Sequence, residues 1–561
     1  MRSKGKFTAA VIGICLMFSG CSQARESFNQ NVQPTQIVKA VSKDVLMDQG
    51  PVRGGSLRLF CTVPDTLNPI LTSNIYVSEM LKNIYDGMVS LDNHLNPVPE
   101  LAEKWVVSED LMTWTFILRK NVMWQDNIPF SAEDVEFTMD EIMKYGGQSS
   151  YRSKLDNIAA YAAVDKNTFR ISLKSPNSFS AEMMTFPIMA KHYYLGEDFA
   201  NTEKNNKPMG TGPYKFVSYE PGKSVNLMLN DKWWSSKGTE GNSVQRPYIA
   251  ELRYNLYQNG NNAINAFQTS DIDVSGMSND DSSKYFGRQD LSIRKYPSRE
   301  YNFIAFNLSK PALSVKAVRQ SIGYAIDKDK LIRDILSGQA TLSELPALPN
   351  TWVNDSTKKK YDFNLEKAQQ LLSEDGWKQT QYGLYKYVNG NYAQLNFDLL
   401  VNSENSDRLS TAQYIADELS PLGIHVNVKS VDFNTFQSLL ASKSYDMALV
   451  GCRVPVIPDF SFLYASWNTR GGNNYCYNIA GYNNAAMDNL LGKAMNTRGT
   501  VEDGNKLKQI YGEIGNLALD ELPYLGLYFN NDSMIYNKKV RGEISPSVID
   551  RYNDIVRWYI P

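Results

Sequence analysis

Histidine is scarce in this chain of 561 residues: there are three, at positions 94, 192 and 425, far apart and without the spacing of metal ligands. A zinc or iron site built by the protein is therefore not expected, and we predict no cofactor. An excess of positive charge is also missing, because 58 Lys and Arg stand against 60 Asp and Glu, with a formal net charge of −2. This balance implies neither a nucleic-acid partner nor a strongly charged one.

The short motifs of secreted hydrolases are absent as well. The sequence contains no G-x-S-x-G, no H-E-x-x-H and no Cys with a His placed by a recognisable motif. Gly210-Thr211-Gly212 suggests a phosphate loop, but it leads into Pro213 and an alternating strand instead of a helix N-terminus. Paired carboxylates of a glycosidase cannot be identified this way, since such partners lie far apart in a chain. We expect a protein that is not an enzyme, with a secreted hydrolase as the alternative from another class.

Long apolar runs are also missing, apart from one near the amino terminus. Three basic residues within the first six precede an apolar run at 7–18, which is too short to span a bilayer as an ordinary helix. Ser19-Gly20-Cys21 follows, so the segment is a secretory signal peptide. Small residues directly before a Cys resemble a bacterial lipobox, although Phe18 stands where Leu is usual. We expect export and anchoring to the outer face of the cytoplasmic membrane through lipidated Cys21; the alternative is a plain secreted protein.

Three cysteines follow Cys21, at positions 61, 452 and 476. An exported protein can keep disulfides, and Cys452 with Cys476 would close a loop. Sequence does not fix connectivity, so this pairing stays open.

The length predicts more than one domain, and 42% hydrophobic with 21% charged residues is the composition of a folded chain. The most informative stretch is 444–464, SYDMALVGCRVPVIPDFSFLY. Residues 447–450 predict a buried strand that breaks at Gly451, and Pro455 and Pro458 then hold the backbone extended. With a strand at 424–431 and a helix around 436–440, this gives a βαβ unit. The end of its last strand would lie at the carboxyl edge of a parallel sheet, where open α/β domains bind ligands.

Three stretches together resemble the family 5 extracellular solute-binding proteins, the oligopeptide and dipeptide receptors of bacterial ABC importers. They are LAEKWVVSEDLMTWTFILRKNVMWQDNIPFSAEDVEFTMDEI (101–142), GTGPYKFVSYEPGKSVNLMLNDKWW (210–234) and YNFIAFNLSKPALSVKAVRQSIGYAIDKDKLI (301–332). The resemblance implies an α/β fold, a periplasmic-binding-protein-like type II clamp of two lobes with an additional inserted domain. The expected parts are a signal peptide at 1–20, a lipidated tether at 21–52, a discontinuous lobe I at 53–86, 187–297 and 530–561, an inserted domain II at 87–186, and a lobe III at 298–529.

The function implied by the resemblance is that of an extracytoplasmic substrate-binding lipoprotein of an ABC importer. The lobes would close around a peptide or peptide-like ligand, and the closed form would deliver it to the permease. We expect a monomer whose partners are the ligand, the permease subunits and, through the lipid, the membrane. The alternative is the same fold with a non-peptide ligand: a metal chelate, a sugar or an anionic small molecule.

Peptide-binding members of this family hold an extended ligand by strand-like backbone hydrogen bonds to two segments. By position these are Ser73-Asn74-Ile75 and Gly451-Cys452-Arg453. Tyr301 and Phe433 fall near positions that line side-chain pockets in the family, although core packing is the commoner role of any single ring.

One position departs from the peptide-binding pattern. Four residues after the glycine, peptide binders usually carry an Asp that pairs with the ligand's α-amino group, and here the position is Pro455. Either another acid, such as Asp459 or Asp432, meets the amine, or the ligand lacks a free amine there. Arg453 favours the second option because a guanidinium beside the cleft attracts a carboxylate or another anion, unless it points to solvent or to a structural acid.

Overall fold

The computed structural model describes residues 50–237, 247–277, 285, 287–354, 361–469, 477–497 and 504–561. The predicted signal peptide, Cys21 and most of the tether lie outside these residues, as does Cys476. The lipid anchor and the Cys452–Cys476 pairing therefore stay predictions.

A mixed sheet of eleven strands in the described part of the chain draws on segments from both ends of the sequence. The strand order is β18-β17-β19-β12-β20-β11-β1-β10-β9-β8, and β13 pairs with β20. The bounds are β1 Gly54–Thr62, β8 Tyr214–Glu220, β9 Ser224–Leu229, β10 Ile249–Tyr257, β11 Val274–Met277, β12 Leu291–Phe306, β13 Ala340–Leu342, β17 Asn396–Asn402, β18 His425–Val431, β19 Met447–Arg453 and β20 Tyr524–Asn537.

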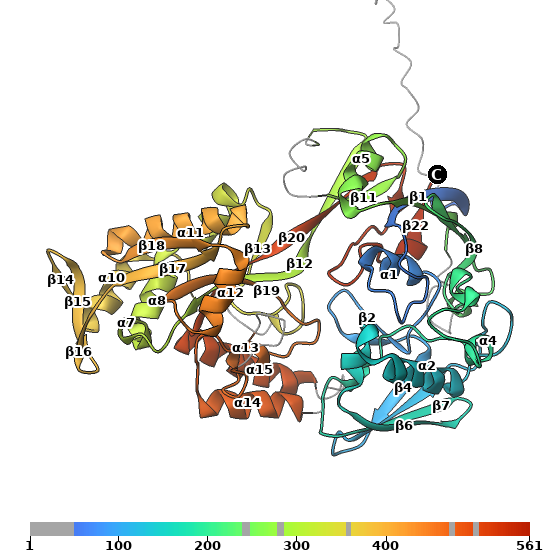
Figure 1. Cartoon of the computed structure of the whole chain (residues 1–561), viewed down its shortest axis with the longest axis horizontal. Helices are drawn as coiled ribbons and strands as arrows, with labels where there is room; N and C mark the ends of the chain where they lie inside the picture. The colour runs from blue at the N-terminus through green and yellow to red at the C-terminus, as the bar shows by residue number, and fades with distance from the viewer. Residues whose placement is uncertain are drawn as a thin grey trace, which may run out of the picture. The chain divides into compact units, whose positions relative to one another are not determined.

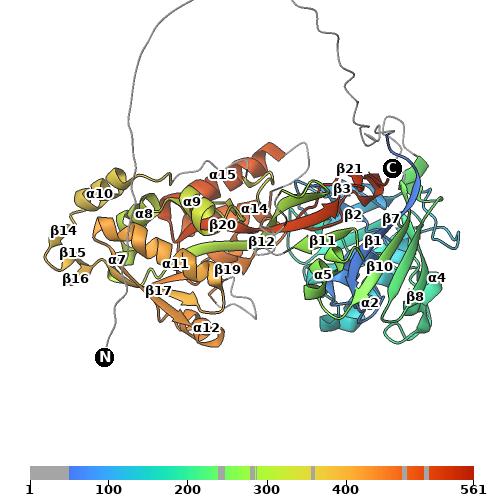
Figure 2. The same ribbon diagram turned by 90° about the horizontal axis from the view of Figure 1, so that it is seen from above.

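The two long strands β12 and β20 connect the two halves of this sheet (Figures 1 and 2). They pair antiparallel from Leu291 opposite Asn537 to Ala305 opposite Tyr524. Strand β20 also pairs with β11, near the start of β12. Strand β12 also pairs with β19, near its own end. The pairing breaks register between Pro297 and Tyr301, because a proline has no backbone N–H to donate to the ladder. The second half of β12 is apolar and buried, whereas its first half is largely polar and half-exposed.

Two large hydrophobic cores lie on either side of this connection. One is drawn mostly from residues 301–529, and the other mostly from residues 57–296 and 534–558. The second core includes a four-stranded sheet in the order β4-β5-β7-β6 with helix α2 against it. These elements are β4 Ala102–Val107, β5 Thr113–Leu118, β6 Ile158–Asp165, β7 Thr168–Leu173 and α2 Ala132–Tyr145. Helix α2 begins with a capping box, in which Ser131 and Asp134 satisfy each other's backbone N–H groups.

The predicted βαβ unit is present and belongs to a set of three parallel strands. Strand β17 lies between β18 and β19 and is parallel to both. Asn405 caps helix α11 (Ser406–Leu419), and Asp432 caps helix α12 (Phe433–Ala441) through the N–H groups of Asn434 and Thr435. The prediction that the last strand breaks at Gly451 is wrong, since β19 continues to Arg453 by pairing with β12.

The glycines at 210 and 212 precede the hairpin of β8 and β9 and have a packing role. A Cβ built on Gly210 would lie 1.9 Å from the carbonyl oxygen of Ile84, and one on Gly212 would lie 2.7 Å from it. Gly212 also donates its N–H to that oxygen at 2.8 Å. Only glycine allows these two backbones to approach so closely.

Further helices and shorter strands complete the two halves of the described chain. Their bounds are α1 Ile75–Leu81, β2 Val89–Leu91, β3 Pro97–Pro99, α3 Ser180–Met183, α8 Lys316–Ala325, α10 Leu365–Glu374, β14 Lys378–Thr380, β15 Gly383–Val388, β16 Asn391–Gln394, α13 Ser461–Tyr464, α14 Ala485–Met495 and α15 Gly504–Glu521.

Candidate ligand-binding site

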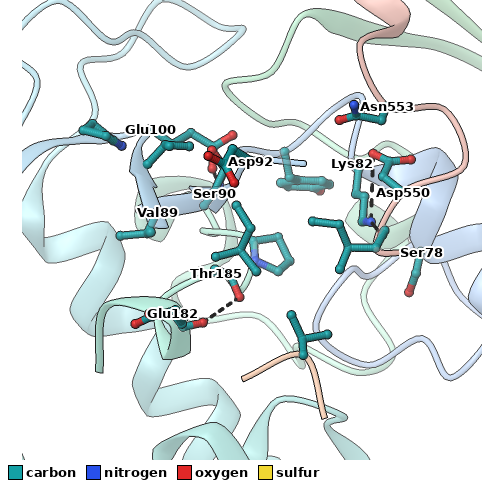
Figure 3. A pocket seen from close by; sticks show the side chains of 18 of the residues that line it. Ser78, Lys82, Val89, Ser90, Asp92, Glu100, Glu182, Thr185, Asp550 and Asn553 are labelled. Atoms are coloured by element: carbon teal, nitrogen blue, oxygen red, sulfur yellow. Dashed lines mark hydrogen bonds and ion pairs between the residues drawn. The ribbon is translucent and has the colours of Figure 1, made fainter. Parts of the chain in front are cut away.

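A cavity of about 1340 Å³ lies beside helix α1 and extends to the loop after β19 (Figure 3). Figure 3 shows Glu182 and Thr185 on one side of it and Ser78, Lys82 and Asp550 on the other. Its walls come from segments that are far apart in the sequence. They are Pro69, α1 and the following turn (78–87), β2 and β3 (89–100), Arg119 and Asn121 after β5, the turn at 150–154, α3 and the segment after it (182–187), residues 233–235, Arg299, the loop 455–457 and the C-terminal segment 549–557.

The loop after β19, which belongs to the stretch 444–464 discussed above, forms part of the cavity wall. Pro455 lines the cavity together with Val456 and Ile457. Asp459 does not line it; its carboxylate instead accepts the N–H of Ser461, at the start of the short helix α13, at 2.8 Å. The proline that stands where an amine-binding Asp is expected therefore faces the cavity. Asp459, one of the acids considered as its replacement, has a structural partner.

Near its end, strand β19 is paired with a neighbouring strand on one side only. Pairing with β17 covers Met447 and Ala448, whereas pairing with β12 continues to Arg453. Beyond Ala448, an extended ligand could therefore add to the side of β19 that faces β17, as the predicted role of Gly451-Cys452-Arg453 requires. Arg453 is exposed at the end of this strand, and Cys452 is buried.

Sequence reasoning missed a further reason for a glycine at position 451. The guanidinium of Arg408, from α11, crosses the strand there, and a Cβ on Gly451 would lie 1.7 Å from its Nη2. Arg408 donates from Nε to Asn302 at 2.9 Å and pairs with Glu300. An isolated glycine inside an apolar strand is a recognised sign of close approach, so the position was detectable from sequence but its partner was not.

The other predicted segment, Ser73-Asn74-Ile75, lies at the start of helix α1. Asn74 caps the helix by accepting the N–H of Tyr76 at 3.1 Å, and Ser73 donates its N–H to Asp65 at 2.9 Å. Ile75 is 52% exposed. Ser73 and Asn74 thus have structural partners, and Ile75 presents an apolar side chain to solvent.

The predicted aromatic residues differ in exposure. Tyr301 is only 1% exposed, and its ring stacks on Phe303 and lies against Phe529 inside the core. Core packing is therefore the role that its contacts show. Phe433 is partly exposed at the first position of α12. Among the residues that the structure describes, the cavity lining includes Pro455 but none of the predicted ligand contacts.

Three basic side chains in the cavity wall, Arg119, Lys154 and Arg299, have pKa values lowered mainly by burial. Burial, with the charges of Lys82 and Arg299, lowers the pKa of Lys154 to about 8. Burial, with the charge of Arg453, lowers the pKa of Arg299 to about 10. Arg299 sits in the register break of β12 and donates from Nε to the carbonyl oxygen of Val454 at 2.8 Å. The break thus turns this side chain toward the cavity.

Glu182 and Glu100 in the same wall have raised pKa values, as does the buried Asp86 beside it. Burial raises the pKa of Glu182 to about 7. Glu100 accepts the N–H of Gly87 at 3.0 Å, and burial together with the charge of Asp86 raises its pKa well above the ordinary value. Burial raises the pKa of Asp86 to about 6, although Trp234 and Thr211 donate hydrogen bonds to its carboxylate. Clusters of perturbed groups around a cavity are typical of functional sites.

Metal sites and membrane-spanning helices were both sought among the described residues. Within the described residues, no group of three or more His, Cys, Asp and Glu is arranged to hold a metal ion. A search of the same residues finds no helix with the length and apolarity needed to cross a membrane.

Comparison with known proteins places these features in a family. The sequence model of the family "Bacterial extracellular solute-binding proteins, family 5 Middle" matches residues 96–474. The oligopeptide-binding protein AppA of Bacillus subtilis is 25% identical over 521 residues, which cover 91% of this chain and 92% of AppA.

Two solved structures share the fold at lower identity. The unliganded open form of MppA, a periplasmic murein tripeptide binding protein, has a TM-score of 0.76 at 18% identity and covers 91% of this chain and 98% of its own. NikZ of Campylobacter jejuni, in complex with Ni(L-His), has a TM-score of 0.62 at 23% identity. The match covers 90% of this chain and 99% of the NikZ chain.

Proposed function

This chain belongs to the bacterial extracellular solute-binding proteins of family 5, which serve ABC importers outside the cytoplasm, and we propose that it captures peptides or peptide-like ligands for import. The cavity of about 1340 Å³ is the single observation that carries this proposal. It exceeds the roughly 300–1,000 Å³ of pockets for drug-sized molecules and so has room for a short peptide. The β19 edge beyond Ala448 adds a surface for backbone pairing.

The proposed clamp uses the lobes predicted from sequence. Lobe I would comprise 53–86, 187–297 and 530–561, lobe III 298–529, and the inserted domain 87–186. The strands β12 and β20 are the connection between the halves of the sheet, and the register break after Pro297 is the natural hinge in one of them. Closing the lobes around a ligand would bring the loop 455–457 toward α1, and the permease would read the closed form.

The ligand is proposed to be held without the usual Asp for its amino group. Pro455 lines the cavity, and a proline cannot replace a carboxylate, because bringing an unpaired α-ammonium out of water costs several kcal/mol. The alternative cargo, a metal chelate or another anionic small molecule, is favoured by one observation: Lys154 and Arg299 both line the cavity. In either case no covalent step is required of the protein.

Anchoring by lipid on Cys21 is part of the proposal and rests on the sequence alone. The chain would act as a monomer, tethered through residues 21–52 to the outer face of the cytoplasmic membrane. Metabolic labelling with a fatty-acid analogue tests this, since the label should appear on the wild type and disappear in Cys21→Ser.

The ligand proposal is tested by mass spectrometry of compounds that co-purify with the mature protein, followed by titration with one recovered peptide. The peptide is compared with its amino-terminally acetylated form. We expect similar affinities for the two forms, because no carboxylate replaces the family's Asp at position 455. A large loss of affinity on acetylation would show that the amine is recognised after all.

A further inference from the structure

The positive side chains of the cavity differ in whether an acid balances them. Lys82 lies 4.0 Å from Asp550, and Arg557 pairs with Glu543. Arg119 lines the cavity without an ion pair among the described residues, but its Nε donates to the carbonyl oxygen of Glu100 and its guanidinium lies over the ring of Trp234. Lys154 and Arg299 also have no carboxylate within 4.0 Å among the residues that the structure describes. These two side chains carry charge into the cavity wall without a counter-ion from the protein.

The contacts of Lys154 show how incompletely its ammonium group is satisfied. Its Nζ donates to the hydroxyl of Thr185 and lies 5.6 Å from the ring centre of Tyr151. Thr185 in turn donates its hydroxyl to the carbonyl oxygen of Glu182 at 3.1 Å, so it is held in place as an acceptor. An ammonium has three donors, and a buried one normally finds an acid or several acceptors.

Arg299 is fixed in a similar way by one contact only. Its Nε is held by the carbonyl oxygen of Val454, which leaves the two terminal nitrogens of the guanidinium directed elsewhere. The fork of these nitrogens is the geometry that binds a carboxylate or a phosphate in a bidentate manner. Arg453 directly precedes Val454 in the chain, and its positive charge acts on Arg299.

We propose that Lys154 and Arg299 form an anion subsite of the cavity, which binds a carboxylate or phosphate group of the cargo. The inference rests on the proposed function, because it names a chemical group of the ligand that the cavity would take. Lys154 supplies a point charge and Arg299 a planar fork, and the anion replaces the counter-ion that the protein lacks. Like charges gathered without an acid destabilise the empty cavity, and the bound anion relieves this repulsion.

The other charged groups near the subsite are compatible with this assignment. Lys82, directly after helix α1, adds a third positive charge, which lowers the pKa of Lys154. Glu182 is the acid nearest in sequence to Thr185, and its raised pKa of about 7 means that part of it is neutral near pH 7. The charge of Glu182 therefore opposes an anion only in part.

The experiment compares four versions of one tetrapeptide pool built from Ala, Phe, Leu and Tyr. The versions are the free acid, the C-terminal amide, the amide with one Glu, and the amide with one phosphoserine. Binding to the purified mature protein is measured by native mass spectrometry. We expect at least one anionic version to bind about tenfold more tightly than the neutral amide. The Glu and phosphoserine versions distinguish a carboxylate from a phosphate.

Variants assign the preference to the two side chains. Lys154→Met and Arg299→Gln should each remove most of it, with about a tenfold loss for the anionic version and less than a twofold change for the neutral amide. Lys154→Arg should retain it, because the charge is kept. Lys223→Met is the matched control, since Lys223 is 76% exposed on the hairpin bend away from the cavity lining.

A second readout keeps the subsite testable even without peptide binding. Inorganic phosphate and acetate, at constant ionic strength, should raise the Tm of the wild type but not of Lys154→Met. If neutral and anionic peptides bind equally, the subsite is wrong while the importer function stands. If no peptide binds but the free anions stabilise the wild type, the subsite stands and the peptide cargo is wrong. If neither peptides nor anions show the dependence on Lys154, the inference is overturned.

Discussion

Replacing Lys154 with methionine should stabilise the empty protein, and the gain should depend on pH. The lysine pKa falls from 10.5 to about 8 on folding, mainly because the ammonium leaves water. A change of this size corresponds to ~3 kcal/mol at 1.36 kcal/mol per factor of ten. Because Lys154 is only partly buried and loses its bond to Thr185 in the variant, we expect a net gain of about 1–2 kcal/mol at pH 7.

The sign of the pH dependence follows from the two pKa values. Below about pH 8 the lysine is charged in both the folded and the unfolded chain, so the full destabilisation of the folded state is present. Between about pH 8 and pH 10.5 the unfolded chain binds more protons than the folded one, so the stability of the wild type rises with pH. The advantage of Lys154→Met should therefore shrink across this window.

Urea unfolding followed by tryptophan fluorescence measures the difference at about pH 7 and about pH 9.5. Lys223→Met serves as the control and should change the free energy of unfolding by less than about 0.5 kcal/mol at either pH, because its side chain is 76% exposed. If Lys154→Met is less stable than the wild type at pH 7, or if its gain is the same at both pH values, the account of Lys154 as a charge without a counter-ion is refuted.

Three further changes test the packing and the anchor. Gly451→Ala should destabilise by about 2–3 kcal/mol, because its Cβ would lie 1.7 Å from Arg408 Nη2, and adding Arg408→Ala should remove most of that loss in a double-mutant cycle of urea melts. Gly210→Ala should cost roughly 3 kcal/mol or more by the same measurement, since its Cβ would meet the Ile84 carbonyl at 1.9 Å and a backbone atom cannot move aside; a loss under 1 kcal/mol would contradict this. Cys21→Ser should move the protein from the membrane fraction to the culture supernatant or periplasm, and unchanged membrane retention would rule out the lipid anchor.

Local patterns predicted the regular elements well where apolar periodicity was strong. The hairpin of β8 and β9, the strand–helix–strand unit around α12 and the capping box of α2 each follow from residues that are close in sequence. The same local signals failed where the chain is polar or crosses between cores. The first half of β12 lacks an apolar face, and β19 passes through Gly451 because β12 supplies its hydrogen bonds.

The site was predictable only in part, because its walls come together through the tertiary fold. Pro455 was singled out from the sequence, and it lines the cavity. Nothing in the local sequence of Lys154 or Arg299 distinguishes them from surface residues. Their importance follows from burial and from the absence of a nearby acid, and both depend on segments more than a hundred residues away.

The central claim, that this chain is a receptor for peptide-like cargo, is tested most directly by loading the emptied protein. The mature protein is unfolded in urea to release bound compounds, refolded, incubated with a tryptic digest of casein and passed through a desalting column. Mass spectrometry then identifies what remains bound. The account predicts that peptides are retained at one per chain and that Lys154→Met and Arg299→Gln retain fewer anionic ones. Retention of no peptide by a refolded protein with the wild-type melting temperature would contradict it.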